Sequence, residues 1–331
     1  MKILVTGGTG FIGRFLVERL VEKGEDVTCF AREGSNLDIL KKLKVKIVLG
    51  NIFDIESLKD AVMDKDIIYH LIAEGNLSAN SEEDFQKFFK VNAEGTKNIL
   101  EAVKRYGKKD IKKIVCFSST AAVGLKNTPV DENTVPDPVS PYQRSKFESE
   151  KIAKGYFEKF GLPVCIVRPS MVFGPYAVKS EILRICRFVK KGVFILFNNG
   201  KNAVPLAYVD DVVDGTLIIG EKGKPGETYF VTWDKVFTMR ELVDSVSKAM
   251  GKKPFVIRIP KIISFPLTFI MEKAAIVLGF RPLVTIERIN SMTSNRVFIV
   301  DKLKGLGFKP EDDLDKAIMK TVEWYKGEGL V

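Results

Sequence analysis

The sequence contains a single histidine, His70, among its 331 residues. A cluster of histidine ligands, which most catalytic zinc sites need, is therefore excluded. The four cysteines, Cys29, Cys116, Cys165 and Cys186, show no C-x-x-C spacing, and the first three lie in apolar, strand-like runs. This usage is typical of small buried side chains in a reducing compartment. The sequence therefore predicts no metal centre.

The sequence also lacks an uninterrupted apolar run of membrane-spanning length. Met1-Lys2 leads directly into a strand-like run, which leaves no room for a signal peptide. A hydrophobic content of 45% with 28% charged residues is ordinary for a globular protein. We expect a cytoplasmic protein and do not expect a membrane partner.

Lysines and arginines outnumber aspartates and glutamates, 52 to 42, and the formal net charge is +10. The densest basic stretches, residues 41–46 and 104–113, lie at expected helix ends and are interspersed with or flanked by acids such as Glu101 and Asp110. Such mixing is typical of a solvated surface, so we expect no nucleic-acid partner. The surplus can steer anionic cofactors and substrates toward the protein.

A glycine-rich turn follows the first strand-like run, residues 3–6, and precedes a helical run to residue 23. The glycines fit both G-x-G-x-x-G and G-x-x-G-x-x-G, in the strand-turn-helix position that a dinucleotide fingerprint requires. Backbone N–H groups and a positive helix end then converge where a pyrophosphate can bind. The residues predicted to contact the cofactor here are Gly7, Gly10, Phe11, Ile12 and Gly13.

The second strand-like run, residues 27–31, ends where an NAD-specific site places an acid for the ribose hydroxyls. Ala31 stands there instead, followed by Arg32 and, shortly after, Ser35. A guanidinium suits a 2′-phosphate, so the sequence predicts NADP(H), with NAD(H) as the alternative if Glu33 pairs with Arg32.

Strand-like runs alternate with helical runs through residue 168. This rhythm predicts an α/β fold with a Rossmann-type, doubly wound parallel sheet and a smaller mixed α/β C-terminal substrate domain. We expect an NADP-binding Rossmann domain over residues 1–175, to which residues 206–222 return. Residues 176–205 and 223–295 would form the substrate-binding region, and residues 296–331 a C-terminal segment.

A second motif, Tyr142-Gln143-Arg144-Ser145-Lys146, opens a long expected helix over residues 140–160. Tyrosine and lysine at i and i+4 share a helix face, and a nearby ammonium would lower the pKa of the phenol toward neutrality. About twenty residues upstream, an apolar strand ends in Ser118-Ser119-Thr120, which puts a hydroxyl at the ligand-binding edge of the sheet. The sequence thus predicts an acid/base site built on Thr120, Tyr142 and Lys146.

With these motifs the chain resembles the extended short-chain dehydrogenase/reductase superfamily (epimerase/dehydratase-like) over essentially its whole length. The further matching segments are His70-Leu71-Ile72-Ala73, Val91-Asn92-Ala93-Glu94-Gly95-Thr96, Arg168-Pro169 and Tyr208-Val209-Asp210-Asp211. The resemblance implies that Tyr142 is the acid/base, that Thr120 hydrogen-bonds the substrate oxygen, and that Lys146 holds the nicotinamide ribose and lowers the tyrosine pKa.

The resemblance also implies a line of further cofactor contacts: Asn51, Ile52, Leu71, Ala73, Asn92 and Pro169. Asn51 replaces an acid that this family usually places beside the adenine, and its amide can still accept a hydrogen bond. We interpret His70 as a packed or hydrogen-bonded support residue, with a general acid as the alternative. Asn92 we interpret as structural and near the site.

Within the superfamily the chain looks most similar to dihydroflavonol-reductase-like and 3-beta-hydroxysteroid-dehydrogenase-like members, on the segments 120–124 and 142–146 and the apolar region after Pro260. This implies an NADP(H)-dependent oxidoreductase that transfers a hydride between nicotinamide and a carbonyl or secondary alcohol. The alternatives are a nucleotide-sugar (UDP-sugar) 4-epimerase with a retained NAD(P) and a non-catalytic protein on the same fold. No motif identifies the small-molecule substrate.

Two apolar segments lead to predictions about assembly and about a lid. Apolar residues on the helices expected at 84–106 and 140–160 predict a homodimer, because equivalent helices pair in this family, unless those residues only face the sheet. The apolar run 262–271, continuing to Phe280, predicts a lid over the substrate, with Phe265 and Phe269 covering it. An interfacial membrane helix is the alternative for this run.

Overall fold

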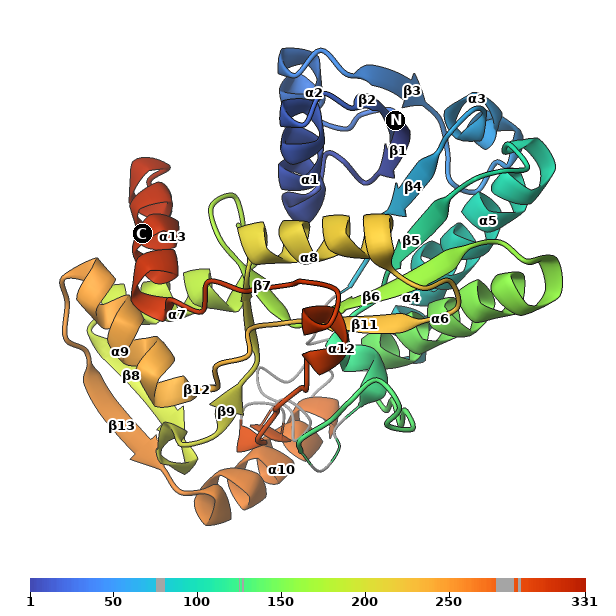
Figure 1. Cartoon of the computed structure of the whole chain (residues 1–331). Coiled ribbons are helices and arrows are strands. Elements are labelled where there is room, and N and C mark those ends of the chain that lie inside the picture. Colours follow the sequence, from blue (N-terminus) through green and yellow to red (C-terminus); the bar gives the residue numbers. More distant parts are fainter. Residues whose placement is uncertain (76–80, 125, 127, 278–288, 291–292) are drawn as a thin grey trace.

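The computed structural model describes residues 1–75, 81–124, 126, 128–277, 289–290 and 293–331. In these ranges seven parallel strands form the main sheet in the order β11-β6-β5-β4-β1-β2-β3 (Figure 1). Their bounds are β1 Lys2–Thr6, β2 Asp26–Ala31, β3 Lys46–Leu49, β4 Ile67–His70, β5 Lys113–Phe117, β6 Val164–Pro169 and β11 Thr228–Val231. The order runs outward in both directions from β1, as in a doubly wound fold, and confirms the predicted fold class.

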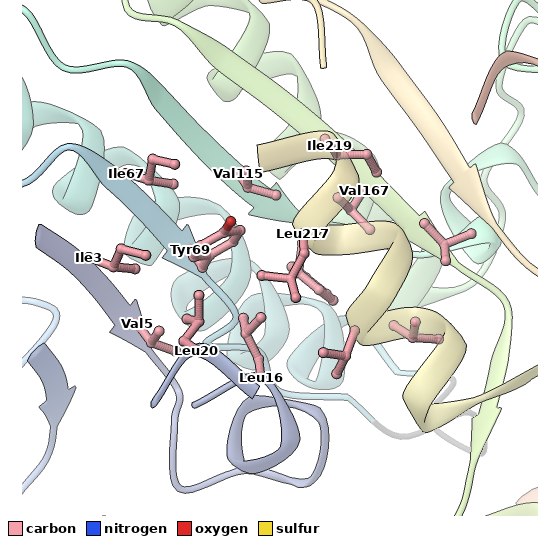
Figure 2. Packing of buried hydrophobic residues seen from close by; sticks show 14 of the residues in the cluster. Ile3, Val5, Leu16, Leu20, Ile67, Tyr69, Val115, Val167, Leu217 and Ile219 are labelled. Carbon is pink, nitrogen blue, oxygen red and sulfur yellow. The ribbon is translucent and has the colours of Figure 1, made fainter. Parts of the chain in front are cut away.

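Helices cover both faces of this sheet because its strands are apolar on both sides. Along β1, Ile3 and Val5 face one core and Leu4 faces the other. On the first face lie α1 (Phe11–Glu22), α2 (Asp38–Lys42) and α8 (Val209–Lys222), whose residues Leu16, Leu20, Leu217 and Ile219 appear in Figure 2. On the second lie α3 (Lys59–Val62), α5 (Gly95–Tyr106) and α6 (Pro141–Phe160).

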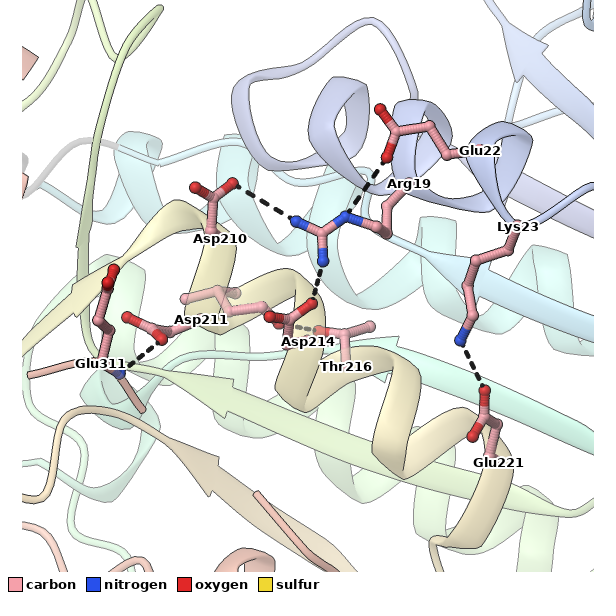
Figure 3. A network of polar contacts seen from close by, with 10 residues as sticks. Arg19, Glu22, Lys23, Asp210, Asp211, Asp214, Thr216, Glu221 and Glu311 are labelled. Carbon is pink, nitrogen blue, oxygen red and sulfur yellow. Dashed lines mark hydrogen bonds and ion pairs between the residues drawn. The ribbon is translucent and has the colours of Figure 1, made fainter. Parts of the chain in front are cut away.

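Charged side chains link α1 to α8 along their solvent edge (Figure 3). Arg19 on α1 contacts both Asp210 and Asp214 on α8, and Lys23 pairs with Glu221 at 3.1 Å. These pairs are largely exposed, so each contributes only about 0–1 kcal/mol to the free energy of unfolding. The apolar core between the two helices therefore supplies most of the stability of this contact.

A second core lies beside the main sheet and contains α7 (Glu181–Lys190), α9 (Met239–Met250) and α13 (Leu314–Gly327). Among the described residues, three two-stranded sheets accompany it. Their strands are β7 Met171–Phe173 with β10 Leu206–Tyr208, β9 Ala203–Val204 with β12 Phe237–Thr238, and β8 Val193–Phe197 with β13 Phe255–Ile259. This is the smaller mixed region that the sequence predicts.

The predicted start of the substrate-binding region at residue 223 needs correction. Residues 228–231 form β11, which pairs with β6 in the main sheet. All four β11 residues are buried, because this short apolar strand closes the sheet edge. The C-terminal segment contributes to both cores: Leu303 on α12 (Asp301–Lys304) packs in a core beside the main sheet, and α13 packs in the second core.

No helix within the described ranges is long and apolar enough to cross a membrane. Helix α10 (Lys261–Val277) holds most of the apolar run. Residues 278–280, the end of that predicted run, lie outside the described residues, as do parts of the predicted region 223–295.

Candidate active site

The glycine loop lies between β1 and α1, where backbone atoms approach one another closely. Gly7 has φ +77°, and a Cβ there would lie 3.0 Å from the backbone of the Leu71–Ile72 loop. A Cβ on Gly13 would lie 2.1 Å from the Gly7 carbonyl oxygen, so only glycine fits. Helix α1 starts at Phe11 with no side-chain cap and no acid in its first turn. Its free N–H groups and positive end suit a phosphate anion.

At the end of β2, Arg32 is exposed and the backbone turns back at Ser35, whose N–H donates to the Arg32 carbonyl at 3.2 Å. Within the described residues Arg32 has no salt-bridge partner; in particular, it does not pair with Glu33. The guanidinium beside the glycine loop is therefore free to bind an anion.

The loop after β3 places Asn51 and Ile52 in different surroundings. Asn51 is exposed, and its side-chain oxygen accepts a hydrogen bond from the Phe53 N–H at 3.0 Å. One lone pair and the amide N–H groups are left for a ligand. Ile52 is buried in the core under the sheet, and its carbonyl accepts from Asn98.

The loop after β4 carries Leu71 and Ala73 along the edge of the glycine loop. Leu71 N–H donates to the Thr6 carbonyl at 3.1 Å, which extends the β1–β4 pairing by one step, and Ala73 is exposed. Residue Glu74 is held at both backbone atoms by the Asn92 amide, each at 2.8 Å.

Asn92 is buried in a π-helical turn, Lys90–Glu94, that joins α4 (Glu82–Phe89) to α5. Its second amide N–H donates to the Ser145 hydroxyl on α6 at 2.9 Å. All its side-chain groups thus bind within the protein, as the structural interpretation predicts. Asn92 fixes the loop after β4 relative to the helix that carries Tyr142, rather than presenting a free group to a cofactor.

Tyr142 lies in the first turn of α6, which a capping box fixes. The Ser140 hydroxyl accepts from the Gln143 N–H, the Gln143 side chain accepts from the Ser140 N–H, and Pro141 follows the cap. The phenol ring packs directly on Gly75, where a Cβ would lie 2.4 Å from the ring.

The pKa of Tyr142 is raised above its usual value by burial, and a hydrogen bond with the Ser119 side chain opposes that rise. The predicted lowering by Lys146 is wrong for this arrangement. Lys146 Nζ is directed at the Phe117 carbonyl oxygen, to which it donates at 3.0 Å. Burial also lowers the pKa of Lys146 to about 8, an effect that the nearby Glu150 carboxylate reduces.

The hydroxyl beside the phenol is Ser119, which the sequence places in the right run but does not single out. Ser119 also caps the short helix Thr120–Val123 by accepting from the Ala121 N–H at 3.1 Å. Thr120 is buried next to it, and its hydroxyl has no hydrogen bond within the described residues. Two hydroxyls with different surroundings therefore lie at this edge.

A buried ion pair underlies the site one helical turn beyond Lys146. Arg168 donates to both Glu150 oxygens, at 2.8 and 2.6 Å, and both side chains are 2% exposed. Pro169, predicted as a cofactor contact, ends β6 and is buried beside this pair. Since removing one member would leave an uncompensated buried charge, the pair ties α6 to β6.

His70 ends β4 and is buried, with its Nδ1 2.7 Å from the Thr6 hydroxyl. Burial and the Lys146 charge lower its pKa to about 3, so the ring is neutral at physiological pH. The packed, hydrogen-bonded interpretation fits this geometry, and a general acid at neutral pH does not.

Most of the predicted site residues therefore lie at the carboxyl ends of β1, β2, β4, β5 and β6 or on the first turns of α1 and α6. A Rossmann-type sheet binds its dinucleotide at this edge. A family model described as "NAD dependent epimerase/dehydratase family" matches residues 3–232. The chain belongs to this family. The resemblance drawn from the motifs is thereby confirmed.

Relatives of this epimerase/dehydratase-family chain carry different activities in their names. It is 28% identical to the "Putative dihydroflavonol 4-reductase" of Synechocystis sp., over 99% of this chain and 95% of that one. It is 31% identical to the "Putative UDP-glucose 4-epimerase" of Methanocaldococcus jannaschii, over 98% of each. Among solved structures, gox2253 superposes with a TM-score of 0.82 at 28% identity, over 99% of each chain. These likenesses support an NAD-dependent family enzyme and leave its reaction open.

Three contributors to the site escape sequence reasoning: Ser119, Glu150 and Gly75. Ser119 is part of the hydroxyl run, and Glu150 follows Lys146 by four residues, so spacing alone could have flagged both. Nothing local marks Gly75, because its role comes from contact with a ring 67 positions later in the chain.

Proposed function

We propose that this protein is an NADP(H)-dependent oxidoreductase that transfers a hydride between nicotinamide and a carbonyl or secondary alcohol. The proposal rests on a partly buried phenol with a raised pKa, Tyr142, beside the Ser119 hydroxyl at the sheet edge that carries the glycine loop. A phenol whose pKa is raised stays protonated at neutral pH and is ready to donate. In the direction of carbonyl reduction, Tyr142 is then the proton donor.

Bound NADPH would supply the hydride for the carbonyl carbon, and the residues of this chain would supply the proton and the hydrogen bonds. Tyr142 donates its proton to the oxygen, which becomes the alcohol. Thr120, whose hydroxyl has no partner in the described residues, donates a hydrogen bond to the same oxygen. Lys146 would hold the nicotinamide ribose, and its hydrogen bond to the Phe117 carbonyl links α6 to the end of β5.

The chain's own groups fit a dinucleotide with a 2′-phosphate. The first turn of α1 offers unpaired N–H groups, and Arg32 has no carboxylate partner in the described part of the chain. A charge-assisted pair between a guanidinium and a phosphate gives both affinity and specificity. We also propose a cytoplasmic location, which all four cysteines, free and buried, support.

Cofactor preference tests the Arg32 assignment. We expect NADPH to bind about tenfold to a hundredfold more tightly than NADH, as one charged hydrogen-bonded contact supplies roughly 1.5–3 kcal/mol. Arg32→Ala should remove this preference and leave the NADH dissociation constant unchanged, measured by fluorescence titration. Lys41→Ala, an exposed cation on the neighbouring helix α2, is the matched control and should keep the preference. Equal dissociation constants in the wild type would rule the assignment out.

The Lys146 pKa predicts a pH dependence of NADPH binding. Since burial lowers this pKa to about 8, the ammonium loses its charge as the pH rises from 7 to 9. NADPH affinity should then fall by roughly tenfold across that range, because one charged hydrogen bond to the cofactor is lost. This fall in NADPH affinity between pH 7 and 9 should persist in Tyr142→Phe. It should disappear in Lys146→Ala, which should bind NADPH weakly over the whole range. A flat profile in the wild type would contradict the assignment.

A homodimer is part of the proposal. Phe85, Phe89 and Phe147 on α4 and α6 remain partly exposed, which supports pairing of these helices between copies. Their neighbours Phe88, Ile152 and Phe157 are used inside the chain. Light scattering at micromolar concentration should give twice the 37.1 kDa chain mass. A mass of one chain would mean that these helices serve only the monomer.

The second candidate is a nucleotide-sugar 4-epimerase, favoured by the full-length likeness to the epimerase-named relative. An epimerase oxidises and re-reduces its substrate on a retained cofactor, whereas a reductase exchanges cofactor each turnover. Purified protein that carries non-exchanging dinucleotide and interconverts UDP-sugars would favour the epimerase. Free exchange with NADPH oxidation on an aldehyde or ketone panel would support the reductase.

A further inference from the structure

Helix α10 is oriented with small side chains inward and large apolar side chains outward. The buried positions are Ser264, Thr268 and Ala275. The exposed positions are Ile262, Ile263, Phe269 and Ile270, with Ile262 82% and Ile270 63% exposed. At 100° per residue these two sets lie on opposite sides of the helix. An apolar face turned to solvent has no role in the core of this chain.

This orientation also bears on the predicted lid. Phe269 is half exposed on the outer side of α10, while Ser264 and Thr268 face the protein interior. The lid role predicted for Phe265 and Phe269 stays a prediction, and the exposure of Phe269 is considered below together with that of its apolar neighbours.

The strand pair β8–β13, which leads through Pro260 into α10, exposes a second set of apolar side chains. Phe255 pairs with Val193 and Ile257 with Ile195, and all four side chains are exposed, Phe255 to 71%. Strand β13 runs along the outer edge of the molecule and leads into α10 (Figure 1). We call these two strands and the outer side of α10 the β13–α10 face.

The two sequence segments that contribute to this face are rich in cations, with Glu181 and Glu272 just outside their ends. Residues 182–209 contain five lysines and arginines, residues 251–271 contain four, and neither segment contains an aspartate or glutamate. Lys190-Lys191 and Lys252-Lys253 precede the two parallel strands at the same end, where Phe255 N–H donates to the Gly192 carbonyl at 2.8 Å. In the described structure none of these four exposed lysines pairs with a carboxylate.

We propose that the β13–α10 face docks on the surface of an anionic phospholipid bilayer. The exposed isoleucines and phenylalanines would enter the interface to about 5–10 Å, and the lysines would meet the lipid phosphates. A second copy of the chain would oppose like charges across this face, which disfavours self-association. A nucleic acid would engage the lysines and leave Ile262 and Ile270 in water.

The apolar contribution is tested by co-sedimentation with vesicles of phosphatidylcholine and phosphatidylglycerol at equal amounts, against phosphatidylcholine alone. We expect the wild type to sediment with the anionic vesicles only. Ile262→Ser/Ile270→Ser should weaken binding at least roughly tenfold, because each side chain loses its apolar transfer from water. Val135→Ser, at an exposed valine outside this face, is the matched control and should bind as wild type.

The charge contribution is tested in the same assay. Lys252→Gln/Lys253→Gln should weaken binding by roughly tenfold or more, since each cation near an anionic surface contributes about fivefold. Lys41→Gln/Lys42→Gln changes the net charge equally on α2 and should leave binding intact. NADPH affinity, measured alongside, should be unchanged in all these variants.

Three outcomes would overturn the proposal. The first is a wild type that binds neither vesicle or binds both equally. The second is binding that survives Ile262→Ser/Ile270→Ser and is displaced by heparin, which would identify a polyanion surface. The third is a dimer that dissociates in this double variant, which would identify an interface between copies.

Discussion

Replacing Tyr142 with phenylalanine should lower turnover at least about a hundredfold, with NADPH affinity little changed. The substitution removes the proton donor and keeps the ring that packs on Gly75 and stands edge-on to Phe88, with ring centres 6.4 Å apart. A loss confined to the chemical step is the signature of a group that acts on the reacting atoms. Turnover would be followed by NADPH absorbance on a confirmed carbonyl substrate, and affinity by fluorescence titration.

Tyr156→Phe is the matched control for this experiment. Tyr156 lies on the same helix, and its hydroxyl donates to Glu101 at 2.9 Å, away from the site. Its removal should leave turnover as in the wild type. If Tyr142→Phe instead kept wild-type turnover, the acid/base would have to be another group.

Gly13→Ala should weaken NADPH binding by more than roughly a hundredfold. The added Cβ would lie 2.1 Å from the Gly7 carbonyl oxygen and 3.0 Å from the Gly8 Cα, and backbone atoms there cannot move aside without deforming the loop. Two displaced N–H donors to phosphate, each at about 1.5–3 kcal/mol, account for this loss. Overpacking should also reduce the free energy of unfolding by about 1–3 kcal/mol, measured by denaturant titration.

Gly155→Ala separates the local effect from a general cost of replacing a glycine. Gly155 lies inside α6 with open space around its Cα, so alanine there should stabilise the protein by about 0.5–1 kcal/mol. Its NADPH affinity should equal that of the wild type. Wild-type affinity in a folded Gly13→Ala protein would show that the phosphate does not bind at this loop.

The sequence by itself was sufficient to predict the order of strands and helices and most of the candidate site residues. The strands predicted at residues 3–6 and 27–31 and the helix predicted at residues 140–160 are present to within a few residues. Alternation of apolar runs and helical periodicity are local properties of the sequence. The glycine loop and the Tyr142–Lys146 pair follow from spacing along one element each. Local patterns therefore locate the cofactor edge without any knowledge of distant contacts.

Only the tertiary structure decided the pKa shifts of the site residues and which segments pack around the main sheet. Desolvation raises the pKa of Tyr142 and lowers that of Lys146. Nζ of Lys146 is directed at the Phe117 carbonyl, and no spacing in the sequence reveals either fact. The membership of β11 in the main sheet and the outward orientation of Ile262 depend likewise on which distant segments pack together. How deeply a side chain is buried, and which groups lie beside it, depend on segments from the whole fold. No single window of the sequence therefore determines the pKa of such a group.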